Sequence, residues 1–185
     1  MDVAINYTIE NIAEIINGKI IQQNSNTTVT HLLLDSRKLL FPENTVFFAV
    51  SSSHRNGSSF IKALYEKEVR CFIIDDKNFN ISKYPFATFI LVDNVLLALR
   101  LLAAHHRSVY TLPVLGITGS NGKTIVKEWL YQLLENDFHI VRSPKSYNSQ
   151  IGVPLSVLQI NKKHTTSPAP SRSIAASSPA VRTTA

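Results

Sequence analysis

The sequence is short of cysteine and of long apolar runs. Cys71 is the one cysteine among 185 residues, which excludes an internal disulfide. Because it stands in the apolar run 71–74, we expect a buried, unreactive thiol. No stretch approaches the roughly 18 to 20 uninterrupted apolar residues of a membrane helix, since Arg100 interrupts residues 96–104. Residues 1–6 have neither the basic start nor the apolar run of a secretion signal. We therefore expect a cytoplasmic protein without a membrane partner.

Acidic residues are absent from residue 161 onward, and this absence explains most of the net charge. Lys162, Lys163, Arg172 and Arg182 supply four of the six excess positive charges. Residues 1–160 keep 15 basic and 13 acidic side chains, a balance that is ordinary for an enzyme. The basic composition therefore gives no indication of nucleic acid as a partner.

Apolar patterning in the first 92 residues indicates an α/β domain. Helical spacing predicts a helix over residues 8–16, capped by Thr8 and followed by Gly18, and another over 58–68. Short apolar runs between turn-forming residues predict buried strands. These strands are expected at residues 31–34, 46–50, 71–74 and 88–92. Strands that alternate with helices are typical of the α/β class.

The remainder of the chain predicts a second α/β region and a tail. Asp93 and Asn94 cap a predicted helix that connects two domains. Strand, glycine-bearing turn, helix, strand and helix follow at residues 112–117, 119–122, 123–135, 138–141 and 152–160. From residue 161 the composition turns to Ser, Thr, Ala and Pro, which predicts disorder. The expected divisions are an N-terminal domain (1–92), a connecting helix (93–107), an incomplete domain (108–160) and a disordered tail (161–185).

The glycine-bearing turn has the composition of a phosphate-binding loop (P-loop). Between a buried strand and a helix, such a turn points backbone N–H groups and the positive end of the helix dipole at one phosphate group. Lys123 adds a full positive charge there, and the Thr124 hydroxyl is placed to ligate Mg²⁺. We expect a nucleoside triphosphate to be bound by Thr118, Gly119, Ser120, Asn121, Gly122, Lys123 and Thr124.

The loop departs by one residue from the usual fingerprint. Five residues separate Gly116 from Gly122, where the fingerprint has four between its first glycine and Gly-Lys-[Ser/Thr]. A plain surface turn is the alternative, but the strand before it and the helix after it favour the phosphate site.

Two other polar motifs have plain structural alternatives. Ser36 and Arg37 follow a predicted strand in an Asp-Ser-Arg sequence that is also a common polar turn. His105 and His106 are adjacent and point to different faces of a helix, so structural roles are favoured over a metal pair.

Longer motifs resemble the Mur ligases, a family of enzymes of cell-wall precursor synthesis. Residues 115–124, followed by Val126-Lys127-Glu128, resemble their ATP loop. Residues 146–154 resemble an Asn-rich segment that ends in Ile-Gly-Val-Pro. Residues 35–37 and 46–50 resemble the N-terminal domain that holds the uridine nucleotide of the substrate.

The resemblance implies an ATP-dependent amide ligase with Mg²⁺ and ATP as cofactors, and we expect a monomer. ATP phosphorylates the terminal carboxylate of UDP-N-acetylmuramoyl-tripeptide, and the amine of D-alanyl-D-alanine attacks the acyl phosphate. Lys123 is implied as the catalytic lysine, Thr124 as a metal ligand, and Ser36, Arg37, Asn148 and Ser149 as substrate-binding residues.

Members of the family continue well beyond this length, with acidic metal ligands, an adenine-contacting segment and a domain for the incoming amine. We therefore expect a truncated product that has no ligase activity alone. Two other functions stay open. One is a non-catalytic module that binds a UDP-sugar peptide, and the other is a generic P-loop kinase or NTPase to which residues 1–107 would be unrelated.

Overall fold

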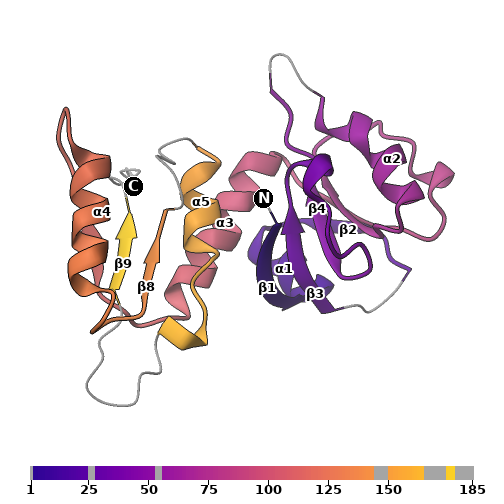
Figure 1. Ribbon diagram of the computed structural model, residues 1–185. Helices are drawn as coiled ribbons and strands as arrows, with labels where there is room; N and C mark the ends of the chain where they lie inside the picture. The colour runs from indigo at the N-terminus through magenta and orange to yellow at the C-terminus, as the bar shows by residue number, and fades with distance from the viewer. Residues whose placement is uncertain (1, 25–27, 53–55, 144–149, 165–173, 178–185) are drawn as a thin grey trace. The chain divides into compact units, whose positions relative to one another are not determined.

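The computed structural model describes residues 2–24, 28–52, 56–143, 150–164 and 174–177 (Figure 1). The chain divides into two compact units, unit 1 (residues 1–102) and unit 2 (residues 103–185). The division falls within the helix α3 (Val95–Ser108), in the segment where a connecting helix is predicted.

Unit 1 is built on a six-stranded mixed sheet with the order β1-β3-β4-β5-β6-β2. Its four inner strands run parallel, and all four confirm strands predicted from apolar runs. They are β3 (Thr28–Leu33), β4 (Thr45–Phe48), β5 (Cys71–Ile74) and β6 (Thr88–Leu91). Every residue of β4 and β5 is buried, as expected for parallel strands that are covered on both faces.

The two edge strands of this sheet are antiparallel to their neighbours and have no counterpart among the predicted elements. β1 (Asp2–Thr8) pairs with β3, and β2 (Lys19–Gln22) pairs with β6. Between them α1 (Ile9–Ile15) confirms the first predicted helix. Thr8 caps it as expected, because its Oγ1 accepts a hydrogen bond from the Asn11 N–H at 3.2 Å.

Short helices connect the inner strands. They are the 3₁₀ turns η1 (Ser36–Lys38), η2 (Gly57–Phe60) and η3 (Ile81–Lys83) and the helix α2 (Ile61–Glu66). The predicted helix at 58–68 is therefore present as η2 followed by α2. One buried cluster of unit 1 lies between the sheet and α2 and consists of Leu33, Phe47, Ala49, Ile61, Leu64, Val69, Phe72, Ile74, Ala87 and Phe89. Other buried side chains of unit 1, among them Ile12, Leu32, Phe48 and Leu99, lie outside this cluster.

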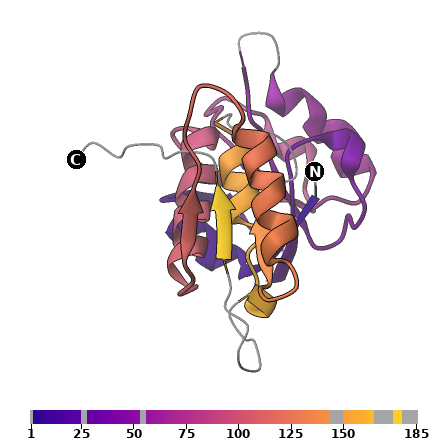
Figure 2. The same ribbon diagram turned by 60° about the vertical axis from the view of Figure 1, so that its left-hand side comes forward.

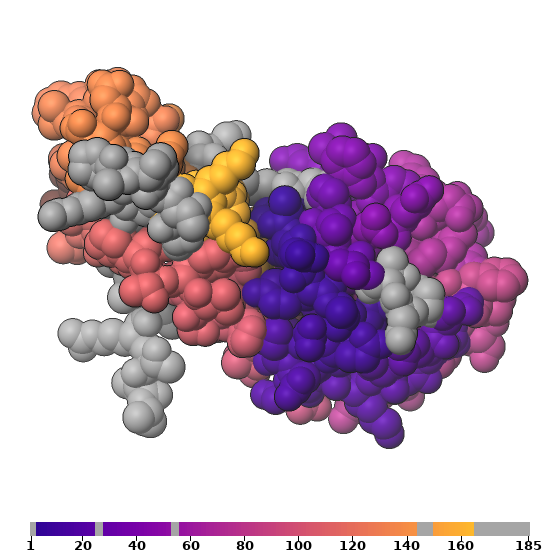
Figure 3. All heavy atoms as spheres, turned by 90° about the horizontal axis from the view of Figure 1, so that it is seen from below, coloured from indigo at the N-terminus to yellow at the C-terminus, as the bar shows by residue number. Residues whose placement is uncertain are grey.

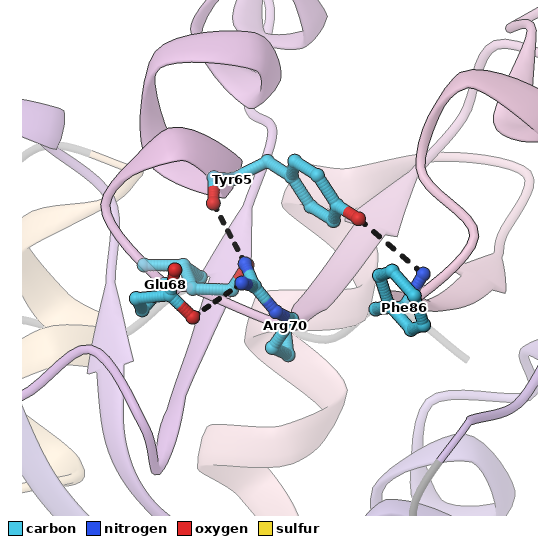
Figure 4. A network of polar contacts seen from close by, with 5 residues as sticks. Tyr65, Glu68, Arg70 and Phe86 are labelled. Atoms are coloured by element: carbon cyan, nitrogen blue, oxygen red, sulfur yellow. Dashed lines mark hydrogen bonds and ion pairs between the residues drawn. The ribbon is translucent and has the colours of Figure 1, made fainter.

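Arg70 joins the end of α2 to the start of β5 (Figure 4). Its guanidinium donates hydrogen bonds to the Tyr65 carbonyl at 2.7 Å and to the Glu68 carboxylate. It also lies 4.4 Å from the centroid of the Tyr65 ring. The Tyr65 hydroxyl in turn accepts from the Phe86 N–H at 3.4 Å, so Arg70 and Tyr65 together connect α2, the start of β5 and the segment before β6.

Unit 2 has a three-stranded parallel sheet with the order β7-β9-β8. Its elements are β7 (Val114–Gly116), α4 (Lys123–Leu134), β8 (Ile140–Arg142), α5 (Gly152–Val157), η4 (Lys162–His164) and β9 (Ile174–Ser177). The helices α4 and α5 lie on opposite sides of the sheet (Figures 1 and 2). The predicted order strand, loop, helix, strand, helix is confirmed. The prediction of a buried strand before the loop is wrong, however, because β7 covers only residues 114–116 and all three are exposed.

The segment expected to be a tail contains η4 and β9, while residues 165–173 and 178–185 of that segment lie outside the described residues. β9 pairs through its main chain with both β7 and β8. Main-chain pairing is available to almost any sequence, so composition does not reveal such a strand.

The core of unit 2 is small among the described residues. Leu112, Val141 and Ile160 form one buried cluster, with Tyr110 and Val157 packed against it, and Leu155 and Leu158 are also buried. Apolar residues of α4 are exposed instead, among them Ile125, Trp129 and Leu133, and α4 stands at the surface of unit 2 (Figure 3). No helix in the described part of the chain is long and apolar enough to cross a membrane.

Candidate phosphate-binding site

Six residues, 117–122, connect the end of β7 to the start of α4. Two glycines give this loop its shape: Gly122, the N-cap of α4, has φ +77°, and Gly119 has φ +149°. A Cβ at Gly122 would meet no heavy atom within 4 Å. Backbone conformation, not space, therefore requires glycine here, because residues with a Cβ rarely adopt these angles.

The N-terminus of α4 is suited to an anion. Gly122 makes no side-chain capping bond, and the first turn of α4 contains no acidic residue. The first N–H groups of a helix have no partners within the helix, and the helix dipole adds partial positive charge there. This helix end can therefore donate hydrogen bonds to a phosphate group.

Lys123 folds back onto the loop. Its Nζ donates hydrogen bonds to the Gly119 carbonyl and, at 3.4 Å, to the Ser120 carbonyl. Its side chain is half-buried, whereas Thr118, Ser120, Asn121 and Thr124 are exposed. The ammonium group is thus held over the loop by main-chain oxygens, which phosphate oxygens can replace.

The structure brings the sequence-predicted residues 118–124 together in one loop, with the Thr124 side chain in the first turn of α4. Among the described residues no group of three or more His, Cys, Asp or Glu side chains is placed to hold a metal ion. A hydroxyl such as that of Thr124 is a suitable ligand for Mg²⁺ that is already carried by phosphates.

Ser36 and Arg37 are the first two residues of η1, which is separated from the end of β3 in unit 1 by two residues. Asp35 caps this turn by accepting from the Arg37 N–H at 3.2 Å, as a polar turn requires. The same carboxylate pairs with the Arg37 guanidinium, at 2.9 Å from Nε and 2.8 Å from Nη2. The hydrogen bond and the charge of Asp35 raise the pKa of Arg37. The Arg37 side chain is 81% exposed, so its guanidinium is accessible to a ligand.

Of the remaining residues considered in the sequence, the structure describes the two histidines but not Asn148 and Ser149. Asn148 and Ser149 lie outside the described residues. His105 is exposed and His106 is buried, which confirms that these neighbours occupy different faces of α3. His106 Nε2 is 2.7 Å from the Ile160 carbonyl oxygen, a structural contact within unit 2.

One charged cluster beside the loop was not predicted from the sequence. Lys127 of α4 is 9% exposed, and its Nζ donates to the Ser143 carbonyl at 2.8 Å. Glu128 pairs with both Lys127 and Arg142. The available signal was the position of Lys127, four residues after Lys123 and therefore on the same side of the helix.

Comparisons with known proteins agree with this arrangement. Residues 117–168 match the model of the Mur ligase middle domain. A UDP-N-acetylmuramoyl-tripeptide–D-alanyl-D-alanine ligase of Bacillus subtilis is 32% identical over 152 residues, which are 82% of this chain and 32% of the relative. The enzyme of the same name from Borreliella burgdorferi is 30% identical over 75% of this chain and 31% of its own length.

Solved structures show the same fold. A crystal structure of MurF from Acinetobacter baumannii has a TM-score of 0.81 at 21% identity and covers 95% of this chain and 36% of its own. MurF ligase from Thermotoga maritima in complex with ADP has a TM-score of 0.63 at 28% identity, over 80% of this chain and 31% of its own.

The strand, glycine loop and helix N-terminus, together with these relatives, define an α/β protein of the P-loop nucleotide-binding class. The chain spans about a third of the length of the curated relatives it matches. It belongs to the Mur ligase family, and its relatives named above are MurF ligases.

Proposed function

We propose that this chain forms the substrate-nucleotide and phosphate-binding part of a cytoplasmic ATP-dependent amide ligase that joins D-alanyl-D-alanine to UDP-N-acetylmuramoyl-tripeptide. The observation that carries the proposal is the loop in which Lys123 and the uncapped N-terminus of α4 converge. The names of the Bacillus and Borreliella relatives support the substrates, and the ADP complex of the Thermotoga relative supports the nucleotide. Ligation itself is proposed for a protein that includes this chain.

The loop residues have separate roles in this proposal. Bound ATP, carried with Mg²⁺, supplies the phosphoryl group that makes a carboxylate a good acyl donor. Lys123 exchanges the Gly119 and Ser120 carbonyls for phosphate oxygens and neutralises negative charge there. The positive φ of Gly119 and Gly122 turns the main-chain N–H groups toward the phosphates. Thr124 offers its hydroxyl to the metal ion.

The UDP-linked substrate is assigned to residues 1–92 and the nucleotide to residues 108–160. Asp35 uses Nε and Nη2 of Arg37 and fixes the plane of the guanidinium. Nη1 can then contact a diphosphate oxygen, with the hydroxyl of Ser36 beside it on η1. Asn148 and Ser149 remain candidates for contacts with the peptide.

Calorimetric titration of the full chain tests the proposal, with Mg-ATP and with UDP-N-acetylmuramoyl-tripeptide in separate experiments. We expect both to bind and Lys123→Met to weaken Mg-ATP binding at least tenfold. Lys62→Met is the matched control, because Lys62 is exposed and pairs only loosely with Glu66, at 4.0 Å. No binding of either ligand by folded chain would refute the proposal.

The two other functions predict different results. A module that only holds a UDP-sugar peptide would bind that ligand without Mg-ATP. A generic P-loop kinase or NTPase would bind Mg-ATP, ignore the UDP-peptide and transfer phosphate to a small acceptor. The likeness of the chain to MurF structures across both units, with 95% coverage, favours the ligase.

A further inference from the structure

Lys127 is the one Lys, Arg, Asp or Glu that is buried among the described residues. A lysine ammonium is seldom buried, because water must be removed from a full charge. Its Nζ donates to the Ser143 carbonyl at 2.8 Å and lies 3.2 Å from Glu128 Oε1. The cost of burial is thus offset by two defined partners, one of them a main-chain atom.

The partners of Lys127 connect the P-loop helix to the strand β8. Glu128, on α4, bridges Lys127 and Arg142, and Arg142 is the last residue of β8. The guanidinium of Arg142 also lies 3.7 Å from the centroid of the Tyr131 ring, on α4. Three residues of α4 are therefore held by the residues at the end of β8. Burial and the nearby positive charge of Arg142 lower the pKa of Lys127.

The position of this cluster relates it to the candidate phosphate site. β7 and β8 are parallel strands of one sheet, each paired with β9. Their carboxyl ends therefore lie at the same end of the sheet. The loop 117–122 leaves the end of β7, and Ser143 follows the end of β8. Ligands of α/β sheets bind outside this end. Lys127 lies one helical turn beyond Lys123, a distance of about 6 Å along the axis.

An apolar side chain would fill the space beneath α4 without any loss of hydration, and such replacements often stabilise proteins. It would not, however, fix the position of the helix along its axis. A hydrogen bond from an ammonium to one carbonyl oxygen has a narrow range of length and direction. The contact to Ser143 therefore limits how far α4 can shift or rotate relative to the end of β8.

We propose that Lys127 is a positioning residue that holds α4, and with it Lys123 and the loop N–H groups, in register with the phosphate-binding end of the sheet. The role in nucleotide binding rests on the proposed function, whereas the mechanical link between Lys127 and the loop does not. Lys127 acts through other groups and need not touch the nucleotide.

Three variants of the full chain test the proposal. Lys127→Met removes the charge and the donor but keeps most of the side-chain volume, Lys127→Arg restores a charged donor, and Lys62→Met is the control on the exposed face of α2. Amide hydrogen exchange of the peptide that covers residues 116–124 is measured without ligand, and Mg-ATP affinity is measured by calorimetry. Circular dichroism verifies that each variant is folded.

In Lys127→Met we expect exchange at residues 116–124 to accelerate at least tenfold and Mg-ATP affinity to fall at least tenfold, with partial recovery in Lys127→Arg. Unchanged exchange at residues 116–124 in folded Lys127→Met would overturn the proposal. Faster exchange with Mg-ATP affinity within twofold of the parent would overturn its nucleotide part.

If the proposed function is wrong, the parent chain itself will not bind Mg-ATP. The exchange measurement still tests whether Lys127 holds residues 116–124 in place, so the two failures can be told apart. If Lys127→Met does not fold, Lys127→Gln takes its place, because it also removes the ammonium that contacts the Ser143 carbonyl but keeps a polar side chain. Exchange at residues 116–124 should then accelerate at least threefold, and no acceleration in folded Lys127→Gln would overturn the proposal.

Discussion

The Nε2 atom of His106 lies 2.7 Å from the carbonyl oxygen of Ile160, and the His106 side chain is buried. A carbonyl only accepts, so Nε2 carries the proton of this hydrogen bond. Burial lowers the pKa of His106, and the positive charge of His105 lowers it further. The hydrogen bond to Ile160 raises the pKa but does not cancel these two effects.

The lowered pKa predicts a pH dependence of stability. The unfolded chain binds a proton at His106 more readily than the folded chain does. The contribution of neutral His106 is therefore complete above the unfolded pKa of about 6.5 and is lost as the pH falls through the folded pKa. We expect the free energy of unfolding from urea titrations to decrease between pH 7.5 and pH 5.

His106→Gln should reduce this decrease, because glutamine does not titrate. His164 adds a change of the same sign, since burial lowers its pKa as well, so the decrease will not vanish. His105→Gln, at the exposed neighbour, should change the decrease only slightly, because it removes a charge near His106 but leaves the buried imidazole in place. A slope that is identical in His106→Gln and the parent chain would contradict the assignment.

Gly57 packs against the main chain at the end of β4. A Cβ at this position would lie 2.2 Å from the carbonyl carbon of Ala49 and 2.8 Å from the nitrogen of Val50. Backbone atoms cannot rotate away as a flexible side chain can. We expect Gly57→Ala to lower the free energy of unfolding of unit 1 by about 2 kcal/mol or more, measured by urea denaturation.

Gly116→Ala is the matched control for this replacement, since a Cβ there meets nothing within 4 Å. Its effect should stay within about 0.5 kcal/mol. Equal stability of the two variants would show that η2 can move away from β4.

The inner sheet of unit 1 was predictable because its strands are buried on both faces and stand out as apolar runs, as in residues 46–48 and 71–74. The edge strands were not. β2 is four residues long and none of them is buried, and Thr8 both ends β1 and caps α1. Pairing at an edge depends on a neighbour that is distant in the sequence, which local patterns do not record.

In the candidate site, too, contacts with residues distant in the sequence could not be predicted. The loop could be recognised because glycine marks positions of left-handed backbone and because lysine and threonine follow at fixed spacing. The spacing of Lys127 from Lys123 indicated its side of the helix but not its burial, since its main partner is a carbonyl oxygen 16 residues away. A main-chain acceptor leaves no trace in the identity of the residue that supplies it.

Cys71 is buried on β5, and this burial raises the pKa of its thiol to about 12. Thiolate is the reactive form, so the folded chain should hardly react with a disulfide reagent at pH 8. We expect one thiol per chain to react rapidly in denaturant, as followed by the absorbance of Ellman's reagent. Rapid labelling of folded chain would contradict the burial of β5.

Arg37 offers a way to separate binding from stability. Its pair with Asp35 is exposed on the arginine side, and water screens such pairs so that they add little to stability. Arg37→Ala should therefore leave thermal unfolding nearly unchanged. If Arg37 contacts the diphosphate of the substrate, calorimetry should show at least tenfold weaker binding of UDP-N-acetylmuramoyl-tripeptide. Lys38→Ala, the next residue of η1, is the control; unchanged affinity in Arg37→Ala would leave Arg37 a turn residue only.

Gly122 holds the N-cap of α4 at φ +77°. An alanine in the left-handed region costs about 1 to 2 kcal/mol, and the loop can relieve that strain only by turning its N–H groups out of position. Since each 1.4 kcal/mol is about a tenfold change in affinity, we expect Gly122→Ala to weaken Mg-ATP binding by about tenfold in calorimetric titrations. Gly116→Ala should bind as the parent does, because Gly116 has no left-handed φ and free space around its Cα. Equal affinity of Gly122→Ala and Gly116→Ala would mean that the nucleotide does not depend on the backbone at the start of α4, and the phosphate-loop assignment would fail with it.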